Sequence, residues 1–140
     1  MSTVREAMVV DPRSLPADAS AQEAGDLLQR PEVRAVYVTD GDRLVGVVTR
    51  KTLVSEVVAA GRDPRNTALG EIAEPPHYTI GPDVPVDDAY RFLEDEDAER
   101  VPVVDEHERL VGVLSRSVLQ RRLAEDENPD EDDEPLPPAA

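Results

Sequence analysis

The stretch Leu110-Val-Gly-Val-Leu-Ser-Arg-Ser-Val-Leu119 has a near copy at Leu44-Val-Gly-Val-Val-Thr-Arg-Lys-Thr-Leu53, 66 positions earlier in a chain of 140 residues. In each copy a run of apolar residues predicts a buried strand. The hydroxyl residue that follows, Ser115 or Thr49, is typical of a helix N-cap. Both stretches therefore predict a strand that turns sharply into a helix, and the rest of the chain can be placed relative to these two corners.

The residues around the first corner predict a compact alternation of helices and strands. Ser20 is followed three residues later by Glu23, which is the pattern of a capping box at the start of a helix. Asp40-Gly41 is a dipeptide typical of a tight hairpin turn. The expected elements are a helical turn at 3–8, an extended piece at 14–15, a helix at 20–30, strands at 35–38 and 44–48, and a helix from 49 to about 60.

The same pattern starts again at residue 69. Leu69 and Ile72 stand 65 positions after Val4 and Ala7, and the later elements keep nearly the same offset. Such self-similarity indicates a duplicated structural unit. The expected elements of the second copy are a short strand at 78–80, a helix from about 86, strands at 101–104 and 110–114, and a helix that opens at 115.

These patterns divide the chain into four segments. We assign 1–61 to a first repeat, 62–68 to a linker, 69–124 to a second repeat and 125–140 to a disordered acidic tail. A unit of roughly 60 residues buries only about 60% of its surface by itself. We therefore expect the two repeats to pack sheet against sheet around one shared core, as a single domain with pseudo-two-fold symmetry.

The chain is strongly acidic, with 31 Asp and Glu residues, 15 Lys and Arg residues and a net charge of −16. Eight of the carboxylates lie between Glu125 and Glu134, a segment with too few apolar residues to form a core. Two interpretations of this segment stay open, a solvating tail and a docking segment for a basic partner. The acidic balance lacks the basic footprint of a nucleic-acid-binding protein, so no nucleic acid partner is expected.

Several classes of site and location are disfavoured by the residues that the chain lacks. It contains no cysteine, which excludes disulfides, thiol nucleophiles and cysteine-ligated metal sites. No apolar run approaches the roughly 20 residues that a membrane-spanning helix needs, and residues 1–10 do not have the pattern of a secretion signal. We expect a cytoplasmic protein with no membrane partner.

His77 and His107 have no partners at ligand spacing, and no nucleophile lies in a pattern with a base. Neither a metal site nor an enzyme is therefore predicted.

The duplicated segments resemble the CBS domain, the family named after cystathionine β-synthase, which typically occurs as a tandem pair called a Bateman module. The resemblance implies an α/β (α+β) fold of two β-α-β-β-α repeats, a regulatory role, and binding of adenosine-containing ligands such as AMP, ADP, ATP or S-adenosylmethionine in two clefts between the repeats. The stretches that carry it are Arg34-Ala-Val-Tyr-Val38 and Leu44-Val-Gly-Val-Val-Thr49 in the first copy, and Thr79-Ile-Gly-Pro-Asp83, Arg100-Val-Pro-Val-Val-Asp105 and Leu110-Val-Gly-Val-Leu-Ser115 in the second.

The two corner hydroxyls are candidate ligand-binding groups. The first amides of a helix are unsatisfied donors at its positive end, which suits phosphate, although Thr49 and Ser115 could equally be plain N-caps. In the family, an Asp three residues after the hydroxyl binds both ribose hydroxyls. The matching residues here are Thr52, which can make one hydrogen bond, and Val118, whose side chain can make none. The missing carboxylate corresponds to about 1.5–3 kcal/mol, or roughly ten- to a hundredfold in affinity.

Four arginines stand next to the predicted clefts of this acidic chain. Arg34 and Arg100 precede the second strand of each copy, where an arginine contacts phosphate in the nucleotide-sensing gamma subunits of AMP-activated kinase, which resemble this module. Arg50 and Arg116 follow the corner hydroxyls. Guanidinium groups match the geometry of phosphate, but these residues could also neutralise nearby carboxylates. The candidate apolar walls for a base, which could instead be plain core, are Leu15, Val36, Ile80 and Pro102.

The sequence thus favours a regulatory module that senses an adenine nucleotide, S-adenosylmethionine or another phosphorylated small molecule between its repeats. Such a module requires no cofactor and acts through a regulated partner or through its own homodimer, which is the common arrangement in the family. The alternative is an interaction scaffold that has lost adenosine binding, an interpretation that Thr52 and Val118 favour.

Overall fold

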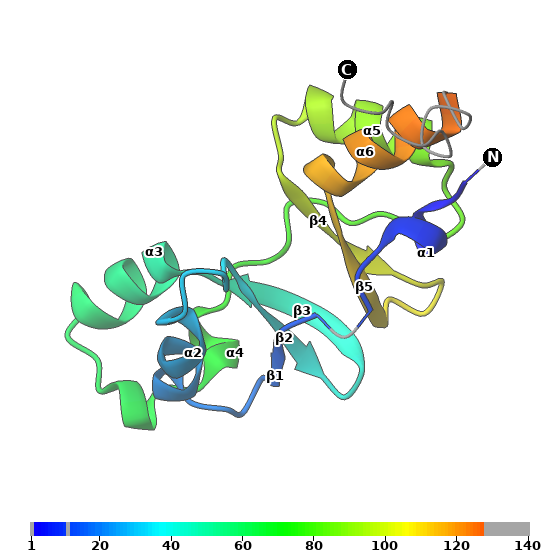
Figure 1. Cartoon of the computed structure of the whole chain (residues 1–140). Helices are drawn as coiled ribbons and strands as arrows, with labels where there is room; N and C mark the ends of the chain where they lie inside the picture. The colour runs from blue at the N-terminus through cyan, green and yellow to red at the C-terminus, as the bar shows by residue number, and fades with distance from the viewer. Residues whose placement is uncertain (1, 11, 128–140) are drawn as a thin grey trace, which may run out of the picture.

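The computed structural model describes residues 2–10 and 12–127 and consists of two similar halves joined at the middle of the molecule (Figure 1). The first half contains a three-stranded sheet in the order β1-β2-β3. Strand β1 (Ser14–Pro16) runs parallel to β2 (Val36–Asp40), which pairs antiparallel with β3 (Arg43–Val48). Its helical elements are α2 (Ala21–Leu28), α3 (Arg50–Leu53), the π-helical turn η1 (Val54–Val58) and the 3-10 turn η2 (Pro64–Asn66).

The second half repeats this plan around an antiparallel pair of strands. Strand β4 (Arg100–Val104) pairs with β5 (Leu110–Ser115), and helices α5 (Val86–Asp95) and α6 (Arg116–Glu127) pack on them. The strand predicted at 78–80 is reduced to one parallel bridge between Ile80 and Val103. The predicted α+β fold of two β-α-β-β-α repeats is confirmed. Helix α6 includes the first residues of the predicted acidic tail, and residues 128–140 of that tail lie outside the described residues.

The two halves exchange their first helices. Helix α1 (Val4–Ala7) belongs to the first repeat in sequence but packs in the second half, where the amide of Val4 donates to the carbonyl of Val84 at 2.9 Å. Helix α4 (Leu69–Ile72) belongs to the second repeat in sequence but packs in the first half, where the amide of Leu69 donates to the carbonyl of Ala19 at 2.8 Å. Each spatial half is therefore completed by a helix from the other sequence repeat.

Each half has its own hydrophobic core, so the expectation of one shared core is wrong. The first core is built around Val36, Val48 and Leu69, and the second around Val4, Val101 and Leu114, all of them fully buried. The segments that carry the exchanged helices cross between the halves and pair with β3 and β5, and the two hairpins also meet directly in a bridge between Arg43 and Arg109. No helix among the described residues is both long and apolar enough to cross a membrane.

Two equivalent glycines allow these crossings. The backbone of Glu74 exchanges two hydrogen bonds with Val47 on β3, and that of Val9 exchanges two with Val113 on β5. A Cβ atom on Gly46 would lie 2.7 Å from the Cβ of Ala73 and 2.9 Å from the carbonyl oxygen of Glu74. A Cβ atom on Gly112 would come similarly close to Met8 and Val9. The glycine of the duplicated Leu-Val-Gly-Val motif is thus the point where the crossing chain contacts the sheet.

Replacing Gly46 with alanine is expected to lower the free energy of unfolding by about 1–3 kcal/mol, the usual cost of forcing extra volume into a packed site. The loss arises because a backbone carbonyl, unlike a flexible side chain, cannot move aside without disturbing its pairing with β3. Urea denaturation of the full chain measures this difference.

The matched control is Gly81→Ala, because a Cβ atom there meets nothing within 4 Å and the backbone of Gly81 does not have a positive φ. We expect its free energy of unfolding to stay within about 0.5 kcal/mol of the parent value. Equal losses for the two variants would contradict the close approach at Gly46.

Candidate functional site

Two cavities meet at Arg34, two residues before β2, and Arg100, the first residue of β4. Cavity A has a volume of about 470 Å³ and cavity B about 230 Å³. The residues that line cavity A are Val9, Pro12, Arg13, Glu32, Val33, Arg34, Ala35, Tyr37, Arg100 and Val113. The residues that line cavity B are Arg34, Ala35, Tyr37, Val47, Pro76, His77, Tyr78, Glu99, Arg100 and Pro102.

The pseudo-symmetry of the chain relates these two cavities. Val113 of cavity A and Val47 of cavity B are 66 positions apart, which is the offset between the repeats. Arg34 and Arg100 have the same separation and line both cavities. Each of the two cavities is therefore lined by residues of both repeats.

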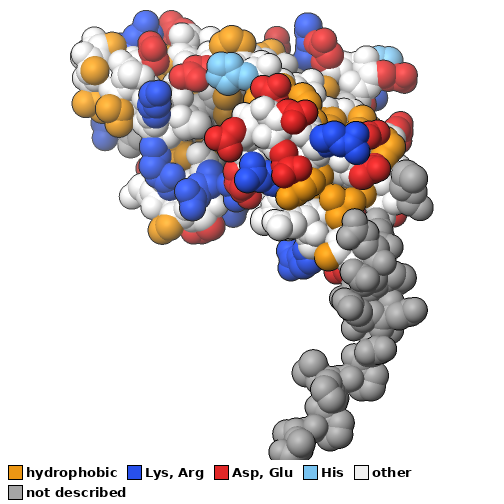
Figure 2. All heavy atoms as spheres, turned by 90° about the horizontal axis from the view of Figure 1, so that it is seen from above, with side chains coloured by type: hydrophobic (Ala, Val, Ile, Leu, Met, Phe, Trp, Pro, Cys, Tyr) orange, Lys and Arg blue, Asp and Glu red, His pale blue; other side chains and the backbone are white. Residues whose placement is uncertain are grey.

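The arginines of these cavities carry uncompensated positive charge. Within residues 2–10 and 12–127, no carboxylate oxygen lies within 4 Å of a guanidinium nitrogen of Arg13, Arg34 or Arg100. On the face shown in Figure 2, basic side chains gather toward the left, and acidic and basic side chains are interspersed toward the right. Glu32 lines cavity A and Glu99 lines cavity B, so the net charge of each lining remains positive. Unpaired guanidinium groups around a cavity suit an anionic ligand.

The other two candidate arginines have protein partners. A terminal nitrogen of Arg50 donates to the carbonyl of Arg30 at 2.9 Å. Arg116, at the start of α6, lies 3.7 Å from a carboxylate oxygen of Asp97. Neither residue lines cavity A or cavity B. Of the four arginines chosen from the sequence, the structure brings two together and places the other two at helix starts outside the cavities.

The hydroxyl at the first corner forms a complete capping box. The amide of Thr49 donates to Oγ1 of Thr52 at 3.0 Å, and the amide of Thr52 donates back to Oγ1 of Thr49 at 3.3 Å. The two hydroxyl oxygens are 3.1 Å apart, and Thr52 is 1% exposed. Thr52 thus takes the place of a capping-box Glu or Gln, and its hydroxyl is already used inside the protein.

The second corner is capped in a simpler way. The amide of Val118 donates to Oγ of Ser115 at 3.3 Å, and the side chain of Val118 offers no group to return the bond. Neither Thr49 nor Ser115 lines cavity A or cavity B. Both hydroxyls therefore act first as N-caps that hold the strand-to-helix corners.

The four predicted apolar wall residues have different surroundings. Pro102 lines cavity B. Val36 and Ile80 are 0% and 9% exposed and belong to the first and second cores, and Leu15 on β1 packs against the first core. Only Pro102 of this set faces either cavity.

Tyr37 lines both cavities, and no local pattern distinguished it from the rest of an apolar strand. Its neighbour across cavity B is Tyr78, whose ring meets that of Phe92 edge-on, with the ring centres 5.4 Å apart. Burial raises the pKa of Tyr37 from 10 to about 12, although the charge of Arg100 acts in the opposite direction. The Tyr37 hydroxyl is therefore neutral at physiological pH. The one sequence signal that could have indicated Tyr37 and Tyr78 is the duplication, because it relates positions 34 and 100, which line the same cavities.

Substituting Tyr37 with phenylalanine is expected to make the protein less sensitive to alkaline unfolding. Because the folded protein raises the pKa of Tyr37, the associated stability is present below pH 10 and is lost as the pH rises towards 12. The slope reaches about 1.4 kcal/mol per pH unit, which amounts to roughly 3 kcal/mol over the two units. Chemical denaturation at pH 9 and pH 11.5 measures the difference, and parallel losses for both proteins would contradict the assignment.

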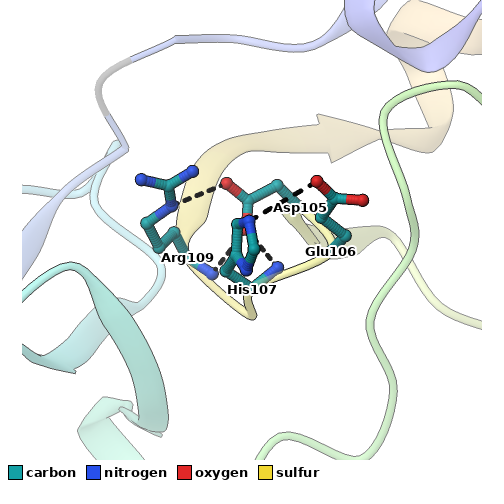
Figure 3. Close-up of polar contacts among 4 residues, drawn as sticks. All are labelled: Asp105, Glu106, His107 and Arg109. Atoms are coloured by element: carbon teal, nitrogen blue, oxygen red, sulfur yellow. Dashed lines mark hydrogen bonds and ion pairs between the residues drawn. The ribbon is translucent and has the colours of Figure 1, made fainter.

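The turn between β4 and β5 contains one of the two histidines (Figure 3). Oδ1 of Asp105 accepts hydrogen bonds from the amides of His107 and Arg109, at 2.8 and 3.0 Å, and Oδ2 accepts one from Nε of Arg109 at 2.8 Å. Partial burial raises the pKa of Asp105, but these hydrogen bonds outweigh it and hold the pKa below its usual value. Among the described residues no three His, Asp or Glu side chains form a group that could hold a metal ion. The carboxylate of Asp105 therefore stabilises the turn between β4 and β5.

Comparison with known proteins places both repeats in one family. The family model described as CBS domain matches residues 4–59 and 69–125. Hypoxic response protein 1 of Mycobacterium tuberculosis is 29% identical over 126 residues, which cover 89% of this chain and 87% of that protein.

Solved structures show the same arrangement of repeats. A crystal structure of hypoxic response protein I with two coordinated zinc ions matches with a TM-score of 0.74 and 26% identity, over 87% of this chain and 99% of the other. The structure of CBSX2 in complex with AMP also has a TM-score of 0.74, with 23% identity over 91% of this chain and 99% of the other. With a family match over both repeats and this common fold, the chain belongs to the CBS domain family as a tandem pair.

Proposed function

We propose that this chain is a cytoplasmic regulatory module that binds an adenine nucleotide, or a related adenosyl or phosphorylated small molecule, between its two repeats. The observation that carries the proposal is the pair Arg34 and Arg100, whose guanidinium groups lack carboxylate partners among the described residues and line both cavities. The complex of CBSX2 with AMP supports it at the level of the family.

The roles we propose for individual residues follow from the lining of the cavities. Arg34 and Arg100 bind phosphate, and Arg13 adds a third positive charge on the side of cavity A. Tyr37, Tyr78 and Pro102 supply flat apolar surface in cavity B, which suits a nucleobase. The contact between Tyr78 and Phe92 holds one of these rings in place. The role is one of binding and regulation, and it requires no cofactor.

The test is a set of melting scans of the full chain with AMP, ADP, ATP and S-adenosylmethionine, each followed by calorimetry. A ligand at 100 times its dissociation constant stabilises the folded protein by about 2.7 kcal/mol, which raises the melting temperature by roughly 8–13 °C. No shift and no binding heat with any of the four ligands would refute the proposal.

One observation favours a second candidate, a ligand-free interaction scaffold. The hydroxyl of Thr52 is used by the capping box and Val118 has no polar side-chain atom, so neither residue supplies the ribose contact of the family. Under this alternative, a partner captured by the chain is retained equally with and without nucleotides. Release or recruitment of the partner by a nucleotide would favour the sensor.

We also propose that the module acts through a homodimer or a regulated partner. Val54 and Val58 on η1 are 59% and 73% exposed. Val58 lines a cavity of about 440 Å³ between α2 and η1, and this cavity adds apolar surface for a second copy to cover. Light scattering should report twice the 15.3 kDa mass of the chain, and a monomer across the micromolar range would contradict the homodimer.

A further inference from the structure

The two cavities are not separate sites, because they share one wall. Arg34, Ala35, Tyr37 and Arg100 line both of them. The remaining lining is specific to each cavity, and three pairs within it are related by the 66-residue offset: Pro12 and Tyr78, Val33 and Glu99, and Val113 and Val47. Arg34 and Arg100 are themselves related by the repeat, so both cavities use the same two guanidinium groups.

The shared pair limits how much negative charge the cavities can hold together. Arg34 and Arg100 contribute two positive charges in total, and a phosphate monoester carries between one and a half and two negative charges at pH 7. One such group therefore neutralises the pair. A second phosphate, bound on the other side, would meet an arginine pair that is already neutralised and a like charge beside it.

The other residues that line each cavity do not replace the positive charge that the first phosphate neutralises. Cavity B has no further Lys or Arg, and Glu99 adds a negative charge to it. Cavity A has Arg13, but Glu32 offsets it. No third unopposed cation among these lining residues is available for a second phosphate.

We propose that the chain binds one phosphate-bearing ligand at a time, and that phosphate in either cavity excludes phosphate from the other. This inference rests on the proposed function, since it concerns the regulation of the same site. Its consequence is that two different nucleotides compete for the chain although they would enter different cavities. A module built in this way reports the ratio of two nucleotides and not the sum of their concentrations.

Calorimetry of the full chain with AMP and with ATP, extended to high ligand excess and paired with native mass spectrometry, tests the stoichiometry. We expect one nucleotide per chain, with any second binding event at least about tenfold weaker. Two equal and independent binding events would overturn the inference but leave nucleotide binding intact. The absence of any binding would remove the proposed function, and the inference with it.

A single substitution provides a second, independent measurement. Because Arg34 lines both cavities, Arg34→Ala should weaken every nucleotide-binding event of the chain. If the two cavities were independent, the variant would still bind one nucleotide as tightly as the parent chain. That result would overturn the proposal that both cavities use the same arginines. Arg91→Ala is the control, because Arg91 lies on α5, pairs with Asp88 at 3.8 Å and lines neither cavity.

Discussion

Replacing Arg100 with alanine is expected to weaken the binding of AMP by roughly ten- to a hundredfold. A hydrogen bond to a charged group contributes about 1.5–3 kcal/mol, and each 1.4 kcal/mol corresponds to a factor of ten in the dissociation constant. Arg100 begins β4 and lines both cavities, and no carboxylate among the described residues lies within 4 Å of its guanidinium group. Its positive charge is therefore available to a ligand in either cavity. Isothermal titration calorimetry measures the change in affinity.

The stability of the same variant separates a binding role from a structural one. Arg100 is exposed, so the free energy of unfolding without ligand should stay within about 0.5 kcal/mol of the parent value. Arg91→Ala, which also removes one exposed arginine, should change neither stability nor affinity. If Arg100→Ala bound AMP as tightly as the parent chain, the phosphate role of this residue would be wrong.

Truncating Leu69 to alanine is expected to lower the free energy of unfolding by about 2–5 kcal/mol. Leu69 is 0% exposed and lies in the first core, although it belongs to the second repeat in sequence. The substitution leaves a cavity beside Val36 and Val48, where helix α4 completes the first half. A loss of this size corresponds to a fall of roughly 3–5 °C in melting temperature for each kcal/mol. Urea denaturation monitored by circular dichroism measures it.

A truncation on the surface provides the comparison for Leu69→Ala. Val10 is 62% exposed, and Val10→Ala should change the free energy of unfolding by no more than about 0.5 kcal/mol. If Leu69→Ala were equally mild, α4 would not be part of the first core. The exchange of helices between the halves would then be in doubt.

The elements that the sequence predicted well are those whose signals lie within a few residues of each other. The capping box of Ser20 and Glu23 forms as expected, with the amide of Ser20 donating to Oε2 of Glu23 at 2.7 Å. The turn at Asp40-Gly41 forms between β2 and β3, and Gly41 has a φ of 64°, which glycine adopts without strain. Both strand-to-helix corners form where the hydroxyl residues stand.

The resemblance and the duplication pointed to Arg34 and Arg100 together with Arg50 and Arg116, and in the structure the first two line the cavities. The same reasoning could not distinguish them from Arg50 and Arg116. Whether a guanidinium group is free or paired depends on residues far away in sequence, such as Arg30, 20 positions before Arg50. No local pattern carries that information.

The sequence by itself determined the order of the elements, the duplication and the corners, because helix caps, turns and hydrophobic periodicity act over short distances along the chain. Only the tertiary structure decided that α1 and α4 exchange halves, that two cores form in place of one, and that Arg34, Arg100 and Tyr37 share a wall between two cavities. These features depend on how segments some 66 residues apart pack together. That packing follows from the crossings at Gly46 and Gly112, where only a residue without a side chain lets the backbone of one repeat lie against the sheet of the other.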